Sequence, residues 1–292
     1  MRIGIVGAEN SHTAGIAKAL NVEHVLPGIE VTHVWGETTE FAAKAAAAGQ
    51  IPNIVADYTE MIGKVDGVGI DHRDGKYHLA VARQFVEAGL PVFVDKPFCT
   101  DLAEGVEFAR FAKAKGVPVT TFSTQTLQQS TRDFFAAAGE LGPLRSVVTA
   151  GPCDVDDVYG GVFFYAIHQV EPICVLLNSR PVQVTTTRLG GDGVATITFE
   201  CGALATLNCL RGWWGGGGFS ALACGTDGIH FAPLASDPNT YLAGIKCFTE
   251  MFATRREPIA PAAYLQPIAV LQAMRESFAT GRPADVPAVP EI

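Results

Sequence analysis

The chain has few charged residues, no cluster of basic residues and no long apolar run. Charged side chains make up 17% of its 292 residues, and 30 acids against 21 lysines and arginines give a net charge of −9. A chain without grouped basic residues lacks what neutralises phosphates, so we expect no nucleic-acid partner and no binding to an anionic membrane. No apolar run approaches the roughly 18 residues that span a bilayer.

The seven cysteines are scattered and include no C-x-x-C pair. This spacing suits neither a zinc site nor a disulfide framework, and we expect buried reduced thiols and no bound metal. The first residues, MRIGIVG, read as a strand and not as a signal peptide. A reducing cytoplasm is therefore the expected compartment.

The first 120 residues or so alternate short apolar runs with helical patterns. Strands are expected at 3–6, 29–35, 65–70, 91–94 and 117–122, and helices at 13–20, 41–48, 77–88 and 102–115. Strand–helix alternation with short connections is typical of βαβ units. The sequence therefore predicts an α/β domain over residues 1–122 with a doubly wound parallel sheet.

The pattern changes after about residue 145, where runs rich in β-branched residues are separated by glycine turns. Strands are expected at 145–150, 182–189, 194–200, 203–210 and 219–224, with hairpin turns at Cys201-Gly202 and Asp227-Gly228 and helices at 166–177, 240–254 and 267–280. This predicts an α+β domain over residues 123–292 with a large, mostly antiparallel open sheet. A glycine-rich loop with two tryptophans at 213–218 has either a packing role or a role at the pocket.

Ligands of an open α/β sheet bind outside the carboxyl ends of its strands, so the loop from Gly7 to His12 is the first candidate site. A dinucleotide fingerprint, G-x-G-x-x-G, would place glycines where Glu9 and His12 stand. Glu9 would either repel a diphosphate or simply stabilise the helix that follows. Glu37 follows the second strand as a candidate for the ribose hydroxyls or as a solvated loop acid. No basic residue occurs near it until Lys44, so NAD is favoured over NADP.

Lys96 and His168 are the candidates for proton transfer. Lys96 follows a buried strand, so it is either a catalytic lysine that faces the ligand crevice or a surface lysine. His168 stands at a helix start, three residues before Glu171, and is either a general acid/base or a core histidine with satisfied hydrogen bonds. His72, Asp74 and His78 crowd the loop after the third strand, but their spacing does not predict a metal site.

Several short motifs occur in a fixed order along the chain. They are Ile3–Ala8, Tyr77-His78, Glu87–Pro97, Gly139–Leu144, Phe199–Ala203, Gly225–Gly228 and Ser277–Pro283. Together they resemble the Gfo/Idh/MocA family of nicotinamide-dependent dehydrogenases, which includes glucose–fructose oxidoreductase and inositol dehydrogenase. The resemblance implies a Rossmann-type NAD(P)-binding domain followed by a substrate and oligomerisation domain. It also implies a homodimer or homotetramer that assembles through the C-terminal sheet.

The resemblance carries Lys96 and His168 over as catalytic residues. The expected cofactor-binding residues are Gly7, Ala8, Glu9, Asn10, Ser11, His12, Glu37, Asp71, His72, Asp95 and Lys96. The chain departs from the family at its working positions: Gly36 stands at the ribose-acid position, and Phe164 replaces the aspartate that acts with the lysine. Tyr165 is a candidate to supply a hydroxyl in place of that aspartate.

Two functions follow from these residues. The first is an NAD(P)-dependent oxidoreductase that transfers a hydride to or from a small polyol or sugar-like substrate. The alternative is a binding or sensing protein that kept the scaffold and lost the cofactor, because a fold does not determine a function. Intact Lys96 and His168 favour the first, and the changes at Glu9, His12, Gly36 and Phe164 favour the second.

Overall fold

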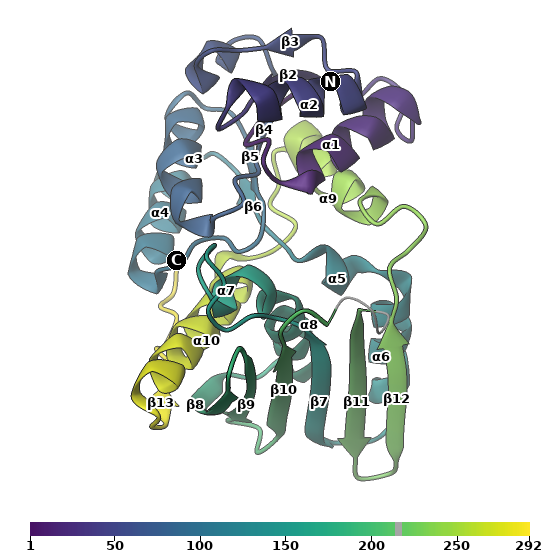
Figure 1. Cartoon of the computed structure of the whole chain (residues 1–292), viewed down its shortest axis with the longest axis vertical. Coiled ribbons are helices and arrows are strands. Elements are labelled where there is room, and N and C mark those ends of the chain that lie inside the picture. Colours follow the sequence, from purple (N-terminus) through teal and green to yellow (C-terminus); the bar gives the residue numbers. More distant parts are fainter. Residues whose placement is uncertain (214–217) are drawn as a thin grey trace.

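The computed structural model describes residues 1–213 and 218–292, and most of the predicted loop at 213–218 lies outside these ranges. Within them the chain forms two layered parts, each built on one sheet (Figure 1). None of the described helices combines the length and apolar character needed to cross a bilayer.

The first sheet is parallel, and its described strands follow the order β3-β2-β1-β4-β5-β6. The strands are β1 (Arg2–Val6), β2 (Glu30–Trp35), β3 (Asn53–Ile54), β4 (Gly67–Ile70), β5 (Val92–Val94) and β6 (Val119–Thr120). β1 and β4 are buried almost throughout, as expected for strands covered on both faces. From β1 the chain adds strands first to one side of the sheet (β2, β3) and then to the other (β4, β5, β6). An open α/β sheet binds its ligand at this switch point, between β1 and β4.

Local sequence signals place the helices around this sheet. They are α1 (Ser11–Ala17), η1 (Lys18–Val22), α2 (Thr39–Gly49), η2 (Tyr58–Met61), η3 (Gly75–Tyr77), α3 (His78–Glu87) and α4 (Leu102–Lys115). Thr38 caps α2 and Asp101 caps α4 by accepting backbone hydrogen bonds, and Gly116 ends α4 in the left-handed conformation. The strand and helix alternation predicted for residues 1–122 is thus confirmed.

The second sheet is mixed, with the order β12-β11-β7-β10-β9-β8-β13 among the described residues. Its strands are β7 (Leu144–Pro152), β8 (Pro181–Leu189), β9 (Asp192–Phe199), β10 (Leu204–Leu210), β11 (Phe219–Gly225), β12 (Ile229–Leu234) and β13 (Ala284–Asp285). Only the pairing of β7 with β10 is parallel in this part of the chain, so the predicted mostly antiparallel sheet is confirmed. Both predicted hairpin turns join neighbouring strands.

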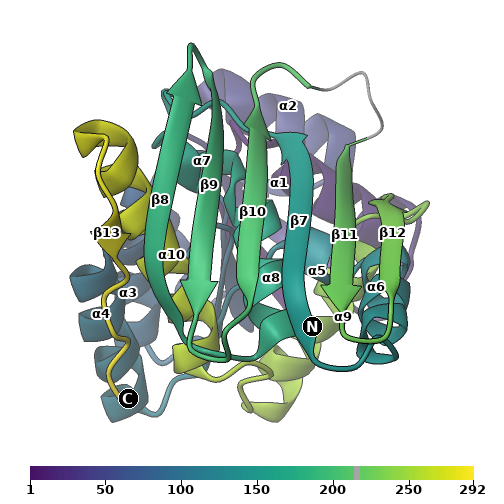
Figure 2. The same cartoon turned by 90° about the horizontal axis from the view of Figure 1, so that it is seen from below.

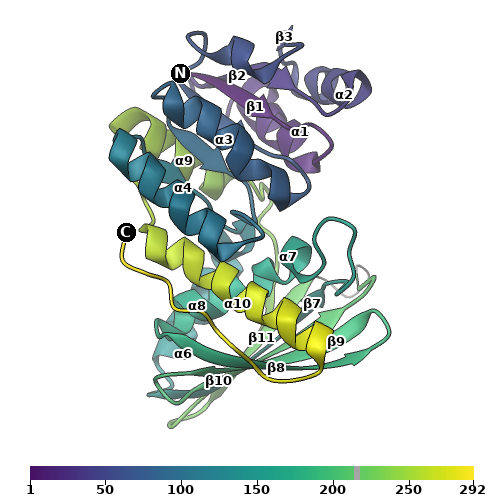
Figure 3. The same cartoon turned by 90° about the vertical axis from the view of Figure 1, so that its left-hand side faces the viewer.

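Helices cover one face of the second sheet. They are α5 (Thr124–Leu127), α6 (Gln129–Gly139), α7 (Val162–Tyr165), α8 (Ile167–Leu177) and α10 (Pro261–Thr280). α10 lies between this sheet and α4 (Figure 3). None of the described helices covers the other face (Figure 2). The exposed Leu204, Ile229 and Phe231 alternate with more buried residues along β10 and β12, so they lie on this face.

Several elements were not predicted from the sequence, among them β3, β13, α5, α6 and β12. α10 begins at Pro261 and not at Pro267, because proline fits the first turn of a helix, where no intrahelical donor is needed. Pro267 then lies inside the helix, where the pattern had suggested a start.

Helix α9 (Leu242–Thr254) follows the second sheet in sequence but packs against the first (Figure 1). Phe93 of β5 stacks on Phe122 at 4.9 Å and on Phe248 of α9 at 4.8 Å between ring centroids. Such stacked aromatic pairs add to the burial of apolar area. The return of α9 brings Tyr241, just ahead of it, to the ligand edge of the first sheet.

Candidate active site

The loops after β1, β4 and β5 meet at one edge of the parallel sheet. The backbone N–H of Asp71 donates to the carbonyl of Val6 at 2.7 Å, and that of Asp95 donates to Ile70 at 2.8 Å. Gly7 has a φ of +107°, and a Cβ there would lie 2.5 Å from the backbone nitrogen of His72. Glycine is therefore needed at position 7 so that these loops can touch, whatever binds above them.

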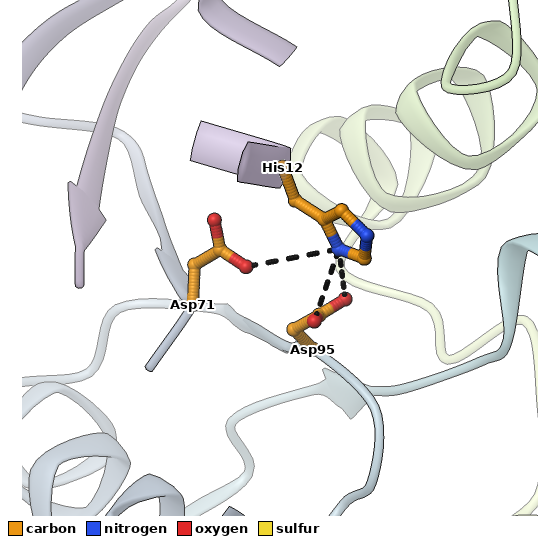
Figure 4. A group of neighbouring side chains, drawn as sticks. All are labelled: His12, Asp71 and Asp95. Atoms are coloured by element: carbon orange, nitrogen blue, oxygen red, sulfur yellow. Dashed lines mark hydrogen bonds and ion pairs between the residues drawn. The ribbon is translucent and has the colours of Figure 1, made fainter. Parts of the chain in front are cut away.

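A cluster of polar side chains lies at this edge, and Figure 4 shows His12, Asp71 and Asp95 at its centre. His12 Nδ1 lies 3.1 Å from both carboxylate oxygens of Asp95 and 3.9 Å from Asp71. The Asn10 amide donates to Asp71 at 2.9 Å and to Asp95 at 3.1 Å. The Thr13 hydroxyl also donates to Asp71. His12, which replaces a fingerprint glycine, thus fills the edge with its own imidazole.

Burial and charge act in opposite directions on the two aspartates. Burial, together with the charge of Asp95, raises the pKa of Asp71 well above its ordinary value. Burial also favours the neutral form of Asp95, but the charge and hydrogen bond of His12, helped by Lys96, outweigh it and lower its pKa. The charge of the pair therefore resides on Asp95, beside His12 and Lys96.

The donor atoms of His12, Asp71 and Asp95 all lie within 4.8 Å of one another. Imidazole and carboxylates are common metal ligands. However, the carbonyl oxygen of the Asn10 side chain accepts from the backbone N–H of His12 at 3.3 Å, which turns its NH₂ group toward both carboxylates. A hydrogen-bond donor in that place, with Lys96 alongside, favours an ion-paired cluster over a metal site. The groups that meet here are not the His72, Asp74 and His78 of the sequence analysis.

Lys96 is buried just after β5 and reaches α7, one of the helices on the second sheet. Its Nζ donates to the Phe164 carbonyl at 3.3 Å and lies 4.8 Å from the Phe164 ring centroid and 5.1 Å from that of Tyr165. Burial lowers the pKa of Lys96, while Asp95 and Asp71 oppose the shift. Phe164 therefore meets the lysine with a carbonyl and a ring, not with the carboxylate of the family aspartate. Tyr165 meets it through its ring.

His168 at the start of α8 is held by Ser123. The Ser123 hydroxyl lies 2.7 Å from His168 Nδ1, and the Ser123 backbone N–H donates to both carboxylate oxygens of Glu171 at 2.9 Å. Burial, and then the charge of Lys96, lower the pKa of His168 well below its ordinary value. The imidazole is thus neutral at physiological pH, and Ser123 leaves Nε2 for exchange with a ligand. Ser123 thus links Glu171 to His168.

Glu171 supplies a pH dependence of stability. Burial raises its pKa from 4.5 to about 7, so between these pH values the folded state holds a proton that the unfolded state has lost. The free energy of unfolding should therefore fall by about 3 kcal/mol as pH rises from about 4.5 to 7, and Glu171→Gln should remove this part of the slope. Urea unfolding of both proteins from pH 4.5 to 8 measures it, with exposed Glu276→Gln as the control. A slope shared by wild type and Glu171→Gln would contradict the assignment.

Glu9 and Glu37 each form hydrogen bonds at the loop after β1 that the dinucleotide fingerprint did not predict. The Glu9 carboxylate accepts from the hydroxyl of Tyr159, which lies between β7 and α7. Glu37 accepts from the backbone N–H groups of Ala8 and Glu9, both at 2.9 Å. A Cβ at Gly36 would lie 2.8 Å from the backbone nitrogen of Ala42, so position 36 provides close packing and Glu37 provides the acid.

Two buried polar atoms at this edge show which part of a dinucleotide the residues could bind. Glu37 Oε1 and His72 Nδ1 have no hydrogen-bond partner among the described residues, and each such atom costs about 1–3 kcal/mol. A ribose diol offers both donors and acceptors for them. A diphosphate would use the backbone N–H groups of Asn10 and Ser11, since those of Ala8 and Glu9 already donate to Glu37. The residues present therefore fit the adenosine half of NAD.

The remaining predicted residues have structural contacts. Ser11 hydrogen-bonds the hydroxyl of Tyr241, whose pKa burial raises to about 12. His78 is fully buried, and its two ring nitrogens lie 2.8 Å from the carbonyl oxygens of Pro97 and His72. Asp74 accepts from the backbone N–H of Lys76 at 3.1 Å.

Several residues of the site were not predicted from the sequence, among them Arg73, Ser123 and Tyr241. Arg73 and Ser123 each follow a strand of the parallel sheet, and the rule that picked out Lys96 could have found them. Nothing local marked Tyr241, because the return of α9 places it here.

Residues 1–123 match a family model described as "Oxidoreductase family, NAD-binding Rossmann fold". The model is that of the Gfo/Idh/MocA oxidoreductase family, so the resemblance inferred from the motifs is confirmed over residues 1–123. No curated protein matches this sequence.

Solved structures with the same fold cover nearly the whole chain. Myo-inositol 2-dehydrogenase from Lactobacillus plantarum is 16% identical with a TM-score of 0.85, and 98% of this chain covers 99% of that chain. Scyllo-inositol dehydrogenase from Lactobacillus casei, solved with NAD(H) and scyllo-inositol, has the same identity, TM-score and coverage. GenD2 from gentamicin A biosynthesis, solved with NAD, is 18% identical with a TM-score of 0.86 over 99% of this chain and 97% of that chain. At these identities the three structures show the fold alone.

Proposed function

We propose that the protein is an NAD-dependent dehydrogenase that transfers a hydride between the coenzyme and a carbinol carbon of a small polyol or sugar-like substrate. The observation that carries this proposal is the meeting of Lys96 and His168 around one ring. Lys96 Nζ lies 5.1 Å from the centroid of Tyr165, and the His168 ring lies 5.2 Å from the same centroid. A cation and a neutral imidazole thus lie together beside the ligand edge of a family NAD-binding domain.

Each residue has a separate task in this proposal. The nicotinamide, when bound, supplies the hydride acceptor or donor. Lys96 holds the substrate oxygen and stabilises negative charge that develops on it, because a buried ammonium acts more strongly in a low dielectric. His168 Nε2 takes the hydroxyl proton or returns it, and Ser123 holds the ring through Nδ1. Glu37 and His72 hold the adenosine ribose.

Two similarities and one residue of this chain support the choice of coenzyme and substrate class. Two neighbours are inositol dehydrogenases, and two are solved with NAD or NAD(H). Glu37 disfavours a 2′-phosphate by its charge, which supports NAD over NADP. The homodimer or homotetramer expected from the sequence remains a proposal, supported by the exposed apolar side chains on the open face of the second sheet.

A titration with NADH tests the proposal directly. We expect NADH to bind more tightly than NADPH and Glu37→Gln to weaken NADH about 10- to 100-fold, the effect of losing a hydrogen bond to a charged group. Coenzyme fluorescence measures the affinities, and exposed Glu40→Gln on α2 is the matched control. If neither coenzyme binds at millimolar concentration, the dehydrogenase proposal is wrong.

A second candidate is a small-molecule binding or sensing protein without a coenzyme. One contact favours it: Glu37 already accepts from the backbone amides of Ala8 and Glu9, which lie in the loop that a fingerprint glycine would open to phosphate. The same titration decides between the two functions, because the second predicts a folded protein that binds neither NADH nor NADPH.

A further inference from the structure

Arg73 lies between the two domains and has no counter-ion among the described residues. It follows β4 by three positions, and its Cζ lies 4.5 Å from the ring centroid of Tyr159 and 5.4 Å from that of Phe164. No carboxylate in the described ranges forms an ion pair or hydrogen bond with it. The two rings lie 5.2 Å apart between centroids, and an arginine that stacks against such rings keeps its in-plane N–H donors for another group.

The acids of the loop that carries Tyr159 are engaged elsewhere. Tyr159 ends an acidic loop, in which Asp154 pairs with Arg211 at 2.9 Å and Asp156 pairs with Arg188. The remaining acid, Asp157, accepts from the backbone N–H of Tyr159 at 2.9 Å.

Glu9, from the facing domain, accepts from the Tyr159 hydroxyl. The loop that ends at Tyr159 therefore lies beside Arg73, but none of its described acids forms an ion pair with Arg73.

Lys96 shares the Phe164 ring with Arg73. Nζ of Lys96 lies 4.8 Å from the centroid of that ring, on which the Arg73 guanidinium also stacks. Two cations around one ring repel each other, and Asp95 offsets the charge of Lys96 but forms no ion pair with Arg73 among the described residues. Because Lys96 is the residue that holds the reacting oxygen, an anion at Arg73 would lie only a few bonds from the reacting carbon.

We propose that Arg73 binds a carboxylate of the substrate, so that the protein acts on hydroxy acids of the sugar-acid type in preference to neutral polyols. This inference rests on the proposed function, whose substrate class it narrows. The guanidinium presents paired N–H donors that match the two oxygens of a carboxylate. The carbinol to be oxidised then lies at Lys96 and His168, and the acid group lies at Arg73.

Matched pairs of ligands test the proposal. D-gluconate and D-glucitol share a carbon skeleton and differ in a carboxylate, as do D-galacturonate and D-galactose. We expect calorimetry to show each acid binding about 10- to 100-fold more tightly than its neutral partner, with and without NADH. Arg73→Met, which keeps the stacking stem, should abolish this preference, and Arg73→Lys should restore part of it. Arg188→Met, at the partner of Asp156 in the acidic loop, is the control and should retain it.

The outcomes separate this inference from the proposed function. If no acid in the panel binds better than its neutral partner, the inference is wrong even if NADH binds. If Arg73→Met weakens NADH and leaves the preference for acids intact, Arg73 binds the coenzyme phosphates and the inference is again wrong. If the wild type does not bind NADH, the dehydrogenase proposal is wrong. The preference for acids, measured without coenzyme, would still decide the role of Arg73.

Discussion

Lys96→Met should lower kcat about 10³-fold while leaving NADH affinity unchanged. Methionine keeps an alkyl chain of similar length between the Phe164 and Tyr165 rings, so the packing survives. It removes the buried ammonium that stabilises charge on the substrate oxygen. Loss of one such catalytic group typically lowers kcat by about 10²- to 10⁴-fold. Steady-state turnover of the preferred panel substrate, with coenzyme fluorescence in parallel, measures both quantities.

The control for this variant is Lys64→Met. Lys64 is exposed and precedes β4, so it lies at the opposite edge of the parallel sheet from the site. Its replacement should leave kcat and NADH affinity unchanged. If Lys96→Met turns over at the wild-type rate, the assigned role is wrong. If Lys96→Met no longer binds NADH, Lys96 binds the coenzyme and not the substrate.

His168→Asn should lower kcat about 10²- to 10³-fold and remove the acidic limb of the pH profile. An asparagine amide can keep the hydrogen bond to Ser123 but cannot take the hydroxyl proton. Because burial lowers the pKa of His168 well below 6.5, the base form persists to pH values below 6.5. We therefore expect kcat/KM for alcohol oxidation to stay level from neutral pH to below 6.5 and to fall only under that.

The coupling between Lys96 and His168 gives this prediction a second readout. The charge of Lys96 contributes to the low pKa of His168, so residual activity of Lys96→Met should show its acidic limb at higher pH. His24→Asn is the matched control, because His24 is exposed and has a φ of +51°, which asparagine tolerates. An unchanged acidic limb in His168→Asn would show that another group takes the proton.

The replacements at the fingerprint positions have partners. His12 stands where a glycine is expected and pairs with Asp95 at 3.1 Å. Glu9 stands at the other glycine position and bonds Tyr159 across the domains. Each substitution therefore changes which side chains hold the ligand edge together. A one-dimensional motif records only the loss of glycine and says nothing about the hydrogen bonds that the new side chains make.

Local patterns in the sequence were enough to predict the order of strands and helices and the edge at which the site lies. Apolar runs, caps and glycine stops act within a few residues, so they predicted the strands ending at Val6, Ile70 and Val94. Parallel strands then bring their carboxyl ends to one edge, and this placed Gly7, Asp71 and Lys96 together. The family motifs added the roles of Lys96 and His168.

The meeting of side chains from distant segments could not be predicted in this way and depends on the three-dimensional fold. Ser123 and His168 are 45 residues apart, and Glu9 and Tyr159 are 150 apart. Arg73 meets Tyr159 because one loop crosses from each domain, and Tyr241 arrives with α9. Such pairings depend on the paths of loops and on the docking of one layer against another. Hydrophobic periodicity is a local property and carries no information about either.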